Sequence, residues 1–200
     1  MAYFDDLRAP LWGRLHLTAR GLLAFGGAVF AVLTCTAMVL SMVEAMPLRL
    51  SLLGRQNYAH AWVFNAGLAT WGGSVFAVAV FMREMRLTCR LGALLLGAGL
   101  IALAQWSAAP LDTEGTGSVL EYRLHMLYCI MTLVGFALAC AGRGLAVGRR
   151  PDIFSLAALY AILCAMGVFV FLPEFYGIAE LVLAALCLIW TYARLPGPRA

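Results

Sequence analysis

The sequence predicts an all-α membrane protein, a compact bundle of six transmembrane helices with both termini on the cytoplasmic side. Composition, six long apolar runs and an uneven distribution of arginine support this prediction. Hydrophobic residues make up 64% of the 200 residues, charged residues 12%, and the mean hydropathy is +0.90. A soluble domain carries about a quarter of its residues as charged side chains, so we expect the bilayer to solvate the outer face. Since roughly 20 residues cross the hydrocarbon, the chain has room for a single transmembrane domain with short connections.

Six apolar runs predict the spans. They lie at 21–43, 61–82, 91–109, 125–147, 153–172 and 175–192. The prolines between them support this count, because each falls in a connection or at a helix start, where its missing N–H costs little. These prolines are Pro47, Pro110, Pro151 and Pro173.

The first twenty residues are predicted to form a cytoplasmic or interfacial leader. They carry Asp5 and Asp6, and the apolar run after them is too long for the core of a cleavable signal. Apolar residues recur there at helical spacing, as in a segment that lies in the membrane interface; an unstructured tail explains the pattern equally well. Pro10 is expected to break or begin a helix in this leader.

The orientation follows from arginine. All fourteen basic residues are Arg, and counting alternate connections puts only Arg49, Arg55 and Arg123 on one side, which leaves eleven on the other. Cytoplasmic loops carry the excess of positive charge, so the sequence predicts a multi-pass membrane protein whose arginine-rich connections face the cytoplasm. Because the arginines lie between apolar runs, they indicate topology and argue against a nucleic-acid partner.

Small residues spaced four apart predict close contacts between helices, or a dimer face. They are Gly27 with Ala31, Ala93 with Gly97, and Ala69 with Gly73 and Ala77. In the second span we therefore expect Gly73 at a helix contact and Val78 facing lipid.

Polar residues gather at the predicted outer ends of the helices and predict an outward-facing polar pocket. Its expected binding residues are His125, Glu180, Asn65, Asp112, Ser51 and Arg55. An ionisable group as deep as Glu180 costs a few kcal/mol in lipid, so it is expected to face the bundle interior and to find a partner, with His125 as the first choice. Cys129 and Thr132 follow His125 on the same helix face.

Each of these residues also fits a structural role. His125 suits a helix start in the interface, and Asn65 suits a hydrogen bond to a neighbouring helix. Glu180 is within reach of the outer surface, and Asp112 suits a turn or a helix N-cap. These residues are predicted to lie at a similar depth near the outer face of the membrane, and this common position favours a pocket.

Cofactor and catalytic chemistry find little support. His16 is cytoplasmic, so only His60 and His125 remain for a bis-histidine haem, and a zinc site would need both with one carboxylate. We therefore expect no metal and no cofactor. Ser51, His125 and Asp112 would make a Ser–His–acid set, but no nucleophile motif surrounds the serine, and whether the protein is an enzyme stays open. The six cysteines show no metal or redox spacing and are interpreted as packing residues.

The stretch from Ser51 to Gly67 resembles the loop entering the second span of a bacterial six-helix membrane family, known as domain of unknown function nine hundred and ninety-eight. That family has a Ser-x-x-Gly turn followed by Phe-Asn-x-Gly, matched here by Ser51, Gly54, Phe64, Asn65 and Gly67. Its third span ends in an aromatic-Pro-x-Asp motif and its fourth opens with His, matched by Pro110, Asp112 and His125, with Ala109 in place of the aromatic. The layout is also similar to Frag and DRAM-like membrane proteins, some linked to lipid remodelling, and so implies a lipid-facing role.

Three functions follow from these observations. The first is an inner-membrane protein whose outer pocket binds a small polar group or a lipid headgroup, with membrane lipid as its partner. The second is an accessory subunit that packs against other membrane subunits and has no site of its own. The third is a membrane-embedded lipid hydrolase.

Overall fold

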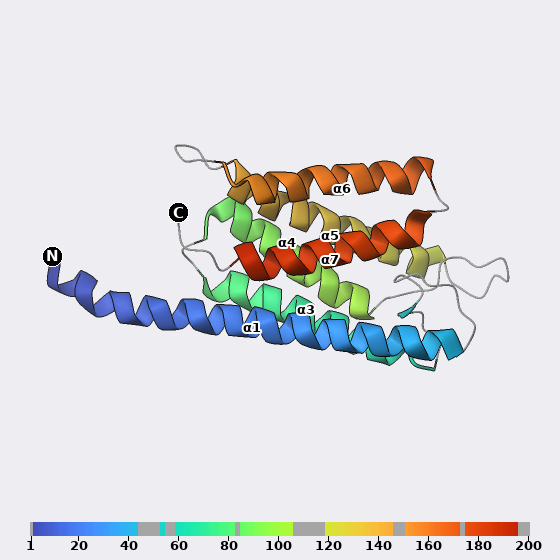
Figure 1. Cartoon of the computed structure of the whole chain (residues 1–200), viewed down its shortest axis with the longest axis horizontal. Helices are drawn as coiled ribbons and strands as arrows, with labels where there is room; N and C mark the ends of the chain where they lie inside the picture. The colour runs from blue at the N-terminus through green and yellow to red at the C-terminus, as the bar shows by residue number, and fades with distance from the viewer. Residues whose placement is uncertain are drawn as a thin grey trace.

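The structure is a computed structural model in which six long helices cross the molecule side by side (Figure 1). It describes residues 2–43, 53–54, 59–82, 85–105, 119–145, 151–172 and 175–195. The helices are α1 (Ala2–Val43), α3 (Ala61–Phe81), α4 (Leu87–Gln105), α5 (Val119–Gly144), α6 (Ile153–Phe171) and α7 (Tyr176–Arg194). Each contains a segment long and apolar enough to cross a membrane. The predicted all-α, six-span fold is confirmed.

The segments that could cross a membrane begin and end within four residues of the predicted spans, whereas the helices α1 and α5 begin well before them, at residues 2 and 119. The helix whose two ends are both displaced by four residues is α4. This helix was predicted over 91–109 and lies at Leu87–Gln105. It begins early because Arg90 does not end the apolar segment: its side chain turns back to the neighbouring helix. Arg90 Nε donates to the Ala79 carbonyl at 2.8 Å and Nη2 donates to the Val80 carbonyl at 3.3 Å. These bonds satisfy carbonyls in the last turn of α3.

Helix α1 is much longer than a membrane span. At about 1.5 Å per residue its 42 residues measure about 63 Å, against roughly 30 Å of hydrocarbon. Its apolar part is Leu17–Met42, and its N-terminal part extends beyond the other helices (Figure 1). The expectation that Pro10 breaks or begins a helix was wrong, because α1 runs through it. Proline removes one backbone hydrogen bond there, and the helix continues on both sides.

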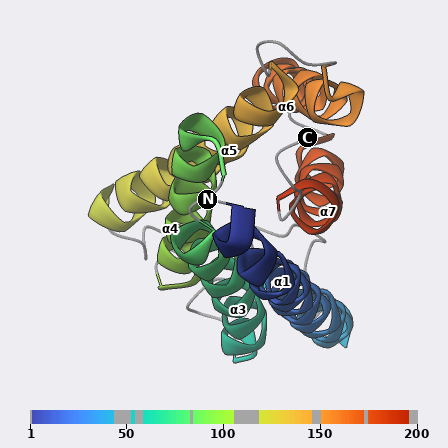
Figure 2. The ribbon, with the colours of Figure 1, turned by 90° about the vertical axis from the view of Figure 1, so that its left-hand side faces the viewer.

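The helices form a ring (Figure 2). Each of them packs on the next one in the sequence, and α7 returns to contact α1. Helices α3, α5 and α7 begin at one end of the bundle, which we call the pocket end, and α1, α4 and α6 begin at the other (Figure 1). We call this second end the arginine-rich end. It carries the side chains of Arg20, Arg86, Arg90, Arg143 and Arg194, whereas Arg123 lies at the pocket end.

Glycines bring α3, α4 and α5 into close contact. A Cβ atom on Gly72 would lie 2.8 Å from Leu100 Cβ, and one on Gly97 would lie 2.7 Å from the Phe76 backbone nitrogen. On the other side of α4, a Cβ on Gly135 would meet the backbone of Leu96. Helix backbones approach this closely only where side chains are absent. The seam predicted for Ala93 and Gly97 is therefore confirmed.

The seam predicted for Gly73 was wrong by one position. A Cβ on Gly73 would have nothing within 4 Å, and the neighbouring Gly72 makes the contact with α4. Val78, expected to face lipid, is 2% exposed. Small residues four apart mark one stripe of α3, but this helix is apolar all round, so the pattern does not indicate which stripe meets a neighbour.

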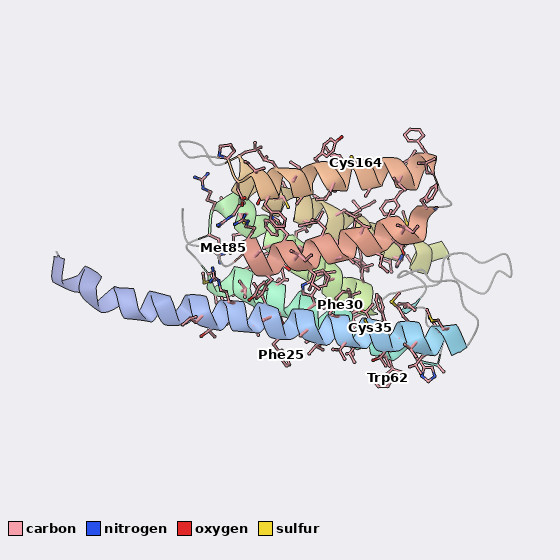
Figure 3. All side chains as sticks on the ribbon, viewed as in Figure 1. Phe25, Phe30, Cys35, Trp62, Met85 and Cys164 are labelled. Carbon is pink, nitrogen blue, oxygen red and sulfur yellow. The ribbon has the colours of Figure 1, made fainter. Side chains whose placement is uncertain are left out.

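Large apolar side chains cover the outside of the ring. Phe25 of α1 and Trp62 of α3 project away from the bundle, whereas Phe30 points toward the other helices (Figure 3). Phe25 and Trp62 are more than half exposed, and Phe30 is buried. An apolar exterior of this kind is what a helix bundle presents to lipid.

Candidate functional site

A cavity of about 430 Å³ lies inside the ring, and all six helices line it. Most of its wall is apolar. The lining side chains are Phe30 from α1; Phe64, Leu68 and Trp71 from α3; Leu100 and Leu103 from α4; His125, Met126, Cys129, Ile130, Thr132, Leu133 and Phe136 from α5; Met166, Phe169 and Val170 from α6; and Glu180, Leu183, Ala184 and Cys187 from α7.

Two of the predicted binding residues meet in this cavity. His125 and Glu180 are 55 positions apart in the sequence, and both line it. Cys129 lies one turn after His125 on α5 and also lines the cavity, and its Sγ is 3.5 Å from His125 Nε2. Thr132 also lines the cavity and donates to the Tyr128 carbonyl at 2.8 Å. These four side chains make one polar group across α5 and α7.

The polar group lies toward the pocket end. Along α5 the lining residues run from His125 through Thr132 to Phe136, a distance of roughly 16 Å at the rise of an α-helix. Along α7 they run from Glu180, in the second turn, to Cys187. On both helices the ionisable residue comes first and the apolar residues lie deeper. The lining is therefore polar near the pocket end and apolar deeper in the bundle, and we call its polar part the mouth.

Aromatic rings form much of the apolar wall. Phe30 stacks on Trp71, with ring centroids 4.8 Å apart and an angle of 27° between the planes. It also meets Phe64 at 6.0 Å in a tilted arrangement. Phe136 packs edge-on against Trp190, with centroids 5.6 Å apart. This aromatic lining was not predicted from the sequence, because aromatic residues also cover the lipid face, as Phe25 and Trp62 do.

Asn65 makes a different contact. Its amide Nδ2 donates to the Gly54 carbonyl at 3.2 Å and so holds the Leu53–Gly54 segment against α3. Two residues further, Gly67 allows α1 to approach, because a Cβ there would lie 3.1 Å from Leu33 Cβ. Asn65 is not among the side chains lining the cavity, although the adjacent Phe64 is. The motif that carried the family resemblance thus joins the loop, α3 and α1.

Three other predicted binding residues, Ser51, Arg55 and Asp112, lie outside the described residues. Arg123 is exposed near the start of α5. In the part of the chain that the structure describes, no three His, Cys, Asp or Glu side chains lie close enough to hold a metal ion. All six cysteines are free thiols, and Cys89, Cys140 and Cys187 are buried in the apolar interior.

A second polar cluster lies at the arginine-rich end and was not predicted. Asp152, just before α6, is the acceptor at its centre: Ser155 Oγ donates to it at 2.9 Å. The Nε atoms of Arg194 and Arg143 lie 3.4 and 3.7 Å from the same Asp152 oxygen. Trp190 Nε1 in turn donates to Ser155 Oγ at 2.9 Å. This cluster ties α5, α6 and α7 together.

The comparisons with known proteins identify a family. A family model described as a protein of unknown function, DUF998, matches residues 24–194. No curated protein and no solved structure gives a significant match. The matched region runs from the first span to the end of the last and includes every helix that lines the cavity. The chain therefore belongs to the DUF998 family of six-helix membrane proteins.

Proposed function

We propose that this chain is a binding protein of the bacterial inner membrane, and that its cavity takes the headgroup and the adjoining apolar part of a lipid-like amphiphile from the outer side. The cavity is the observation that carries the proposal. All six helices contribute side chains to it, and His125 and Glu180 both lie in its mouth. Its volume of about 430 Å³ falls in the range of small-molecule sites, roughly 300–1,000 Å³.

The wall chemistry supports an amphiphile. His125 and Glu180 give the cavity hydrogen-bonding groups in a largely apolar wall, and a few polar groups of this kind orient a polar headgroup in a binding pocket. The deeper wall of Phe30, Trp71 and Phe136 suits an apolar chain. The Trp71 indole N–H is buried and has no hydrogen-bond partner within the described residues, so an oxygen atom of the ligand would also stabilise it.

The distribution of arginine supports the orientation. Of the six arginines whose side chains the structure describes, five lie at the arginine-rich end and Arg123 lies at the pocket end. Under the positive-inside rule the first end is cytoplasmic and the cavity mouth faces outward. Both termini are then cytoplasmic.

Two adjacent alanines on α7 allow a matched test. Ala184 lines the cavity, and Ala185 is exposed on the outside of the ring. Replacing Ala184 by Trp should fill the cavity and reduce the bound amphiphile at least about tenfold, because the indole takes the space of the ligand. Ala185→Trp should leave binding unchanged. Native mass spectrometry of the gently purified protein measures the bound mass in each variant.

Equal retention of a bound molecule by both variants would place it on the lipid-facing surface and contradict the proposal. A protein partner in stoichiometric amount, with no bound amphiphile on the wild type, would favour the accessory subunit instead. Turnover of added lipid that is lost on changing His125 would favour the hydrolase. The same spectra, read for lipids and for subunits, separate the first two outcomes.

A further inference from the structure

The second polar cluster, at the arginine-rich end, carries more positive than negative charge. Arg143 in the last turn of α5 and Arg194 in the last turn of α7 both face one oxygen of Asp152, with their Nε atoms 3.7 and 3.4 Å from Oδ2. The same oxygen accepts a hydrogen bond from Ser155 at 2.9 Å. Asp152 is the only acidic residue at this end whose side chain the structure describes. Two guanidinium groups of the cluster therefore share one carboxylate.

Arg194 is oriented by contacts that do not use its terminal amines. Its Nε faces Asp152, and its Cζ lies 5.3 Å from the centroid of the Phe154 ring, whose face attracts the cation. Among the described residues, no hydrogen bond engages its two terminal nitrogens, and 40% of the side chain is exposed. A guanidinium held in this way presents the planar pair of donors that binds a phosphate group with two parallel hydrogen bonds.

The cluster lies where the membrane spans end. Three segments that could cross a membrane terminate at this level: Arg123–Gly144, Ile153–Phe171 and Gly177–Arg194. The two guanidinium groups therefore lie close to the boundary between hydrocarbon and lipid headgroups. Leu145 and Ile153, at the two ends of the connection between α5 and α6, are both more than half exposed. Positive charge beside exposed apolar side chains is complementary to a lipid that joins a phosphate to acyl chains.

We propose that this cluster binds an anionic phospholipid, with the lipid phosphate against Arg194 and the acyl chains along the exposed apolar side chains at the ends of α5 and α6. The site is separate from the cavity and lies at the opposite end of the bundle (Figure 1), so it does not depend on the ligand of the cavity. Because the cluster joins α5, α6 and α7, a lipid bound there would stabilise the folded state, and the melting temperature reports its binding.

Two lipids of equal chain length test the assignment: anionic dioleoylphosphatidylglycerol and zwitterionic dioleoylphosphatidylcholine. Each is titrated into the full chain in neutral maltoside micelles, and thermal unfolding gives the lipid concentration at which half of the rise in melting temperature is reached. This concentration should be at least about fivefold lower for phosphatidylglycerol, the factor that one arginine contributes at an anionic lipid surface. Inorganic phosphate, which has no acyl chains, should not raise the melting temperature at the same concentrations.

Three variants test whether Arg194 recognises the headgroup. Arg194→Gln removes its charge and leaves Arg143 beside Asp152, so the preference for phosphatidylglycerol should fall to about a third or less. Arg194→Lys keeps the charge and loses the planar donors, so an intermediate preference is expected. Arg86→Gln is the matched control, because Arg86 is exposed at the same end and makes no ion pair in this cluster. Since each preference is a ratio within one variant, a change in overall stability does not affect it.

Four outcomes would contradict the proposal. Equal half-maximal concentrations of the two lipids on the wild type would show that headgroup charge is not recognised. Stabilisation by inorganic phosphate as strong as that by phosphatidylglycerol would show that the cluster takes a free anion and not a lipid. A full preference in Arg194→Gln would place the recognition elsewhere. A preference lost equally in Arg86→Gln and Arg194→Gln would show that the total charge of this end acts, and not the cluster.

Discussion

At the scale of single residues, the best-defined polar contacts lie away from the cavity. Trp190 and Ser155 are both fully buried, and the indole N–H of the first donates to the hydroxyl of the second. The Ser155 hydroxyl donates a hydrogen bond to the Asp152 carboxylate, which also forms an ion pair with Arg194. Arg194 additionally lies over the Phe154 ring, with its Cζ 5.3 Å from the centroid. The Trp190, Ser155 and Asp152 side chains thus form one chain of hydrogen bonds, in which each contact depends on the next.

Replacing Ser155 by Ala should therefore destabilise the protein. The Trp190 N–H would be left buried without its acceptor, which costs about 1–3 kcal/mol. Thr36→Ala is the control, because the Thr36 hydroxyl is exposed and bonds only to the Val32 carbonyl of its own helix. Thermal unfolding in detergent micelles compares the two variants. Equal melting temperatures would show that the buried hydrogen bond contributes nothing measurable.

The sequence identified the residues of the cavity mouth better than those of this cluster. His125 and Glu180 stood out because an ionisable residue inside an apolar run is costly and therefore informative. Asp152 follows Pro151 at a helix start, where an acidic residue is ordinary, and arginines near it were fully explained by topology. Ser155 and Trp190 are 35 positions apart, and only the fold brings them together.

At the scale of elements, close packing depends on a few glycine positions. A Cβ on Gly72 would approach Leu100 Cβ at 2.8 Å and the Gly97 carbonyl oxygen at 3.0 Å. The second of these is a backbone atom, so no side-chain rotation relieves the contact. Helices α3 and α4 would have to separate.

Gly72→Ala is accordingly expected to cost about 1–3 kcal/mol through overpacking. The adjacent Gly73→Ala is the matched control, since a Cβ there meets nothing within 4 Å and alanine favours the helix. Chemical denaturation in mixed micelles, followed by circular dichroism, measures both. A Gly73 variant less stable than the Gly72 variant would mean that the contact register between α3 and α4 is different.

Helix α4 shows that the local sequence pattern does not predict every helix boundary. The predicted start at residue 91 assumed that Arg90 marks the end of the membrane segment, yet Arg90 lies in the first turn of α4 and bonds the last carbonyls of α3. Its long side chain reaches past the helix end. The type and number of elements could be predicted from apolar runs, whereas a boundary set by a contact between two helices could not.

At the scale of the whole molecule, the arginine distribution predicts which end is cytoplasmic. Arg86 is exposed just before α4 at the arginine-rich end, and Leu120 is 66% exposed at the start of α5 at the pocket end. In a cysteine-free background, Leu120→Cys should react with a membrane-impermeant maleimide in intact cells. Arg86→Cys should react only after the membrane is opened.

The reverse labelling pattern would contradict the proposed orientation and turn the cavity mouth to the cytoplasm. Labelling of both positions in intact cells would instead indicate a leaky preparation, which an unlabelled cytosolic protein in the same sample excludes. Folding of the cysteine-free background is checked by its thermal stability, because Cys89, Cys140 and Cys187 are buried.

The order of the helices around the ring was beyond the sequence. Six apolar runs with short connections favour neighbours in sequence as neighbours in space, but they leave open whether the last helix returns to the first. That closure decides whether residues of α1 and α7 share one cavity. Gly27 allows the close contact between α1 and α7, because a Cβ atom on Gly27 would lie 2.8 Å from Leu188 Cδ1.

The return of α7 to α1 has a consequence for biosynthesis. Chains are made from the N-terminus, so α7 leaves the ribosome after the other five helices. Until then Phe30, Phe64 and Phe136 have no α7 beside them, and the carboxylate of the site has not been made. During that interval a membrane chaperone or a lipid molecule can cover the aromatic side chains that the nascent five-helix chain exposes. The cavity is thus completed only when the nineteen-residue helix α7 enters the membrane.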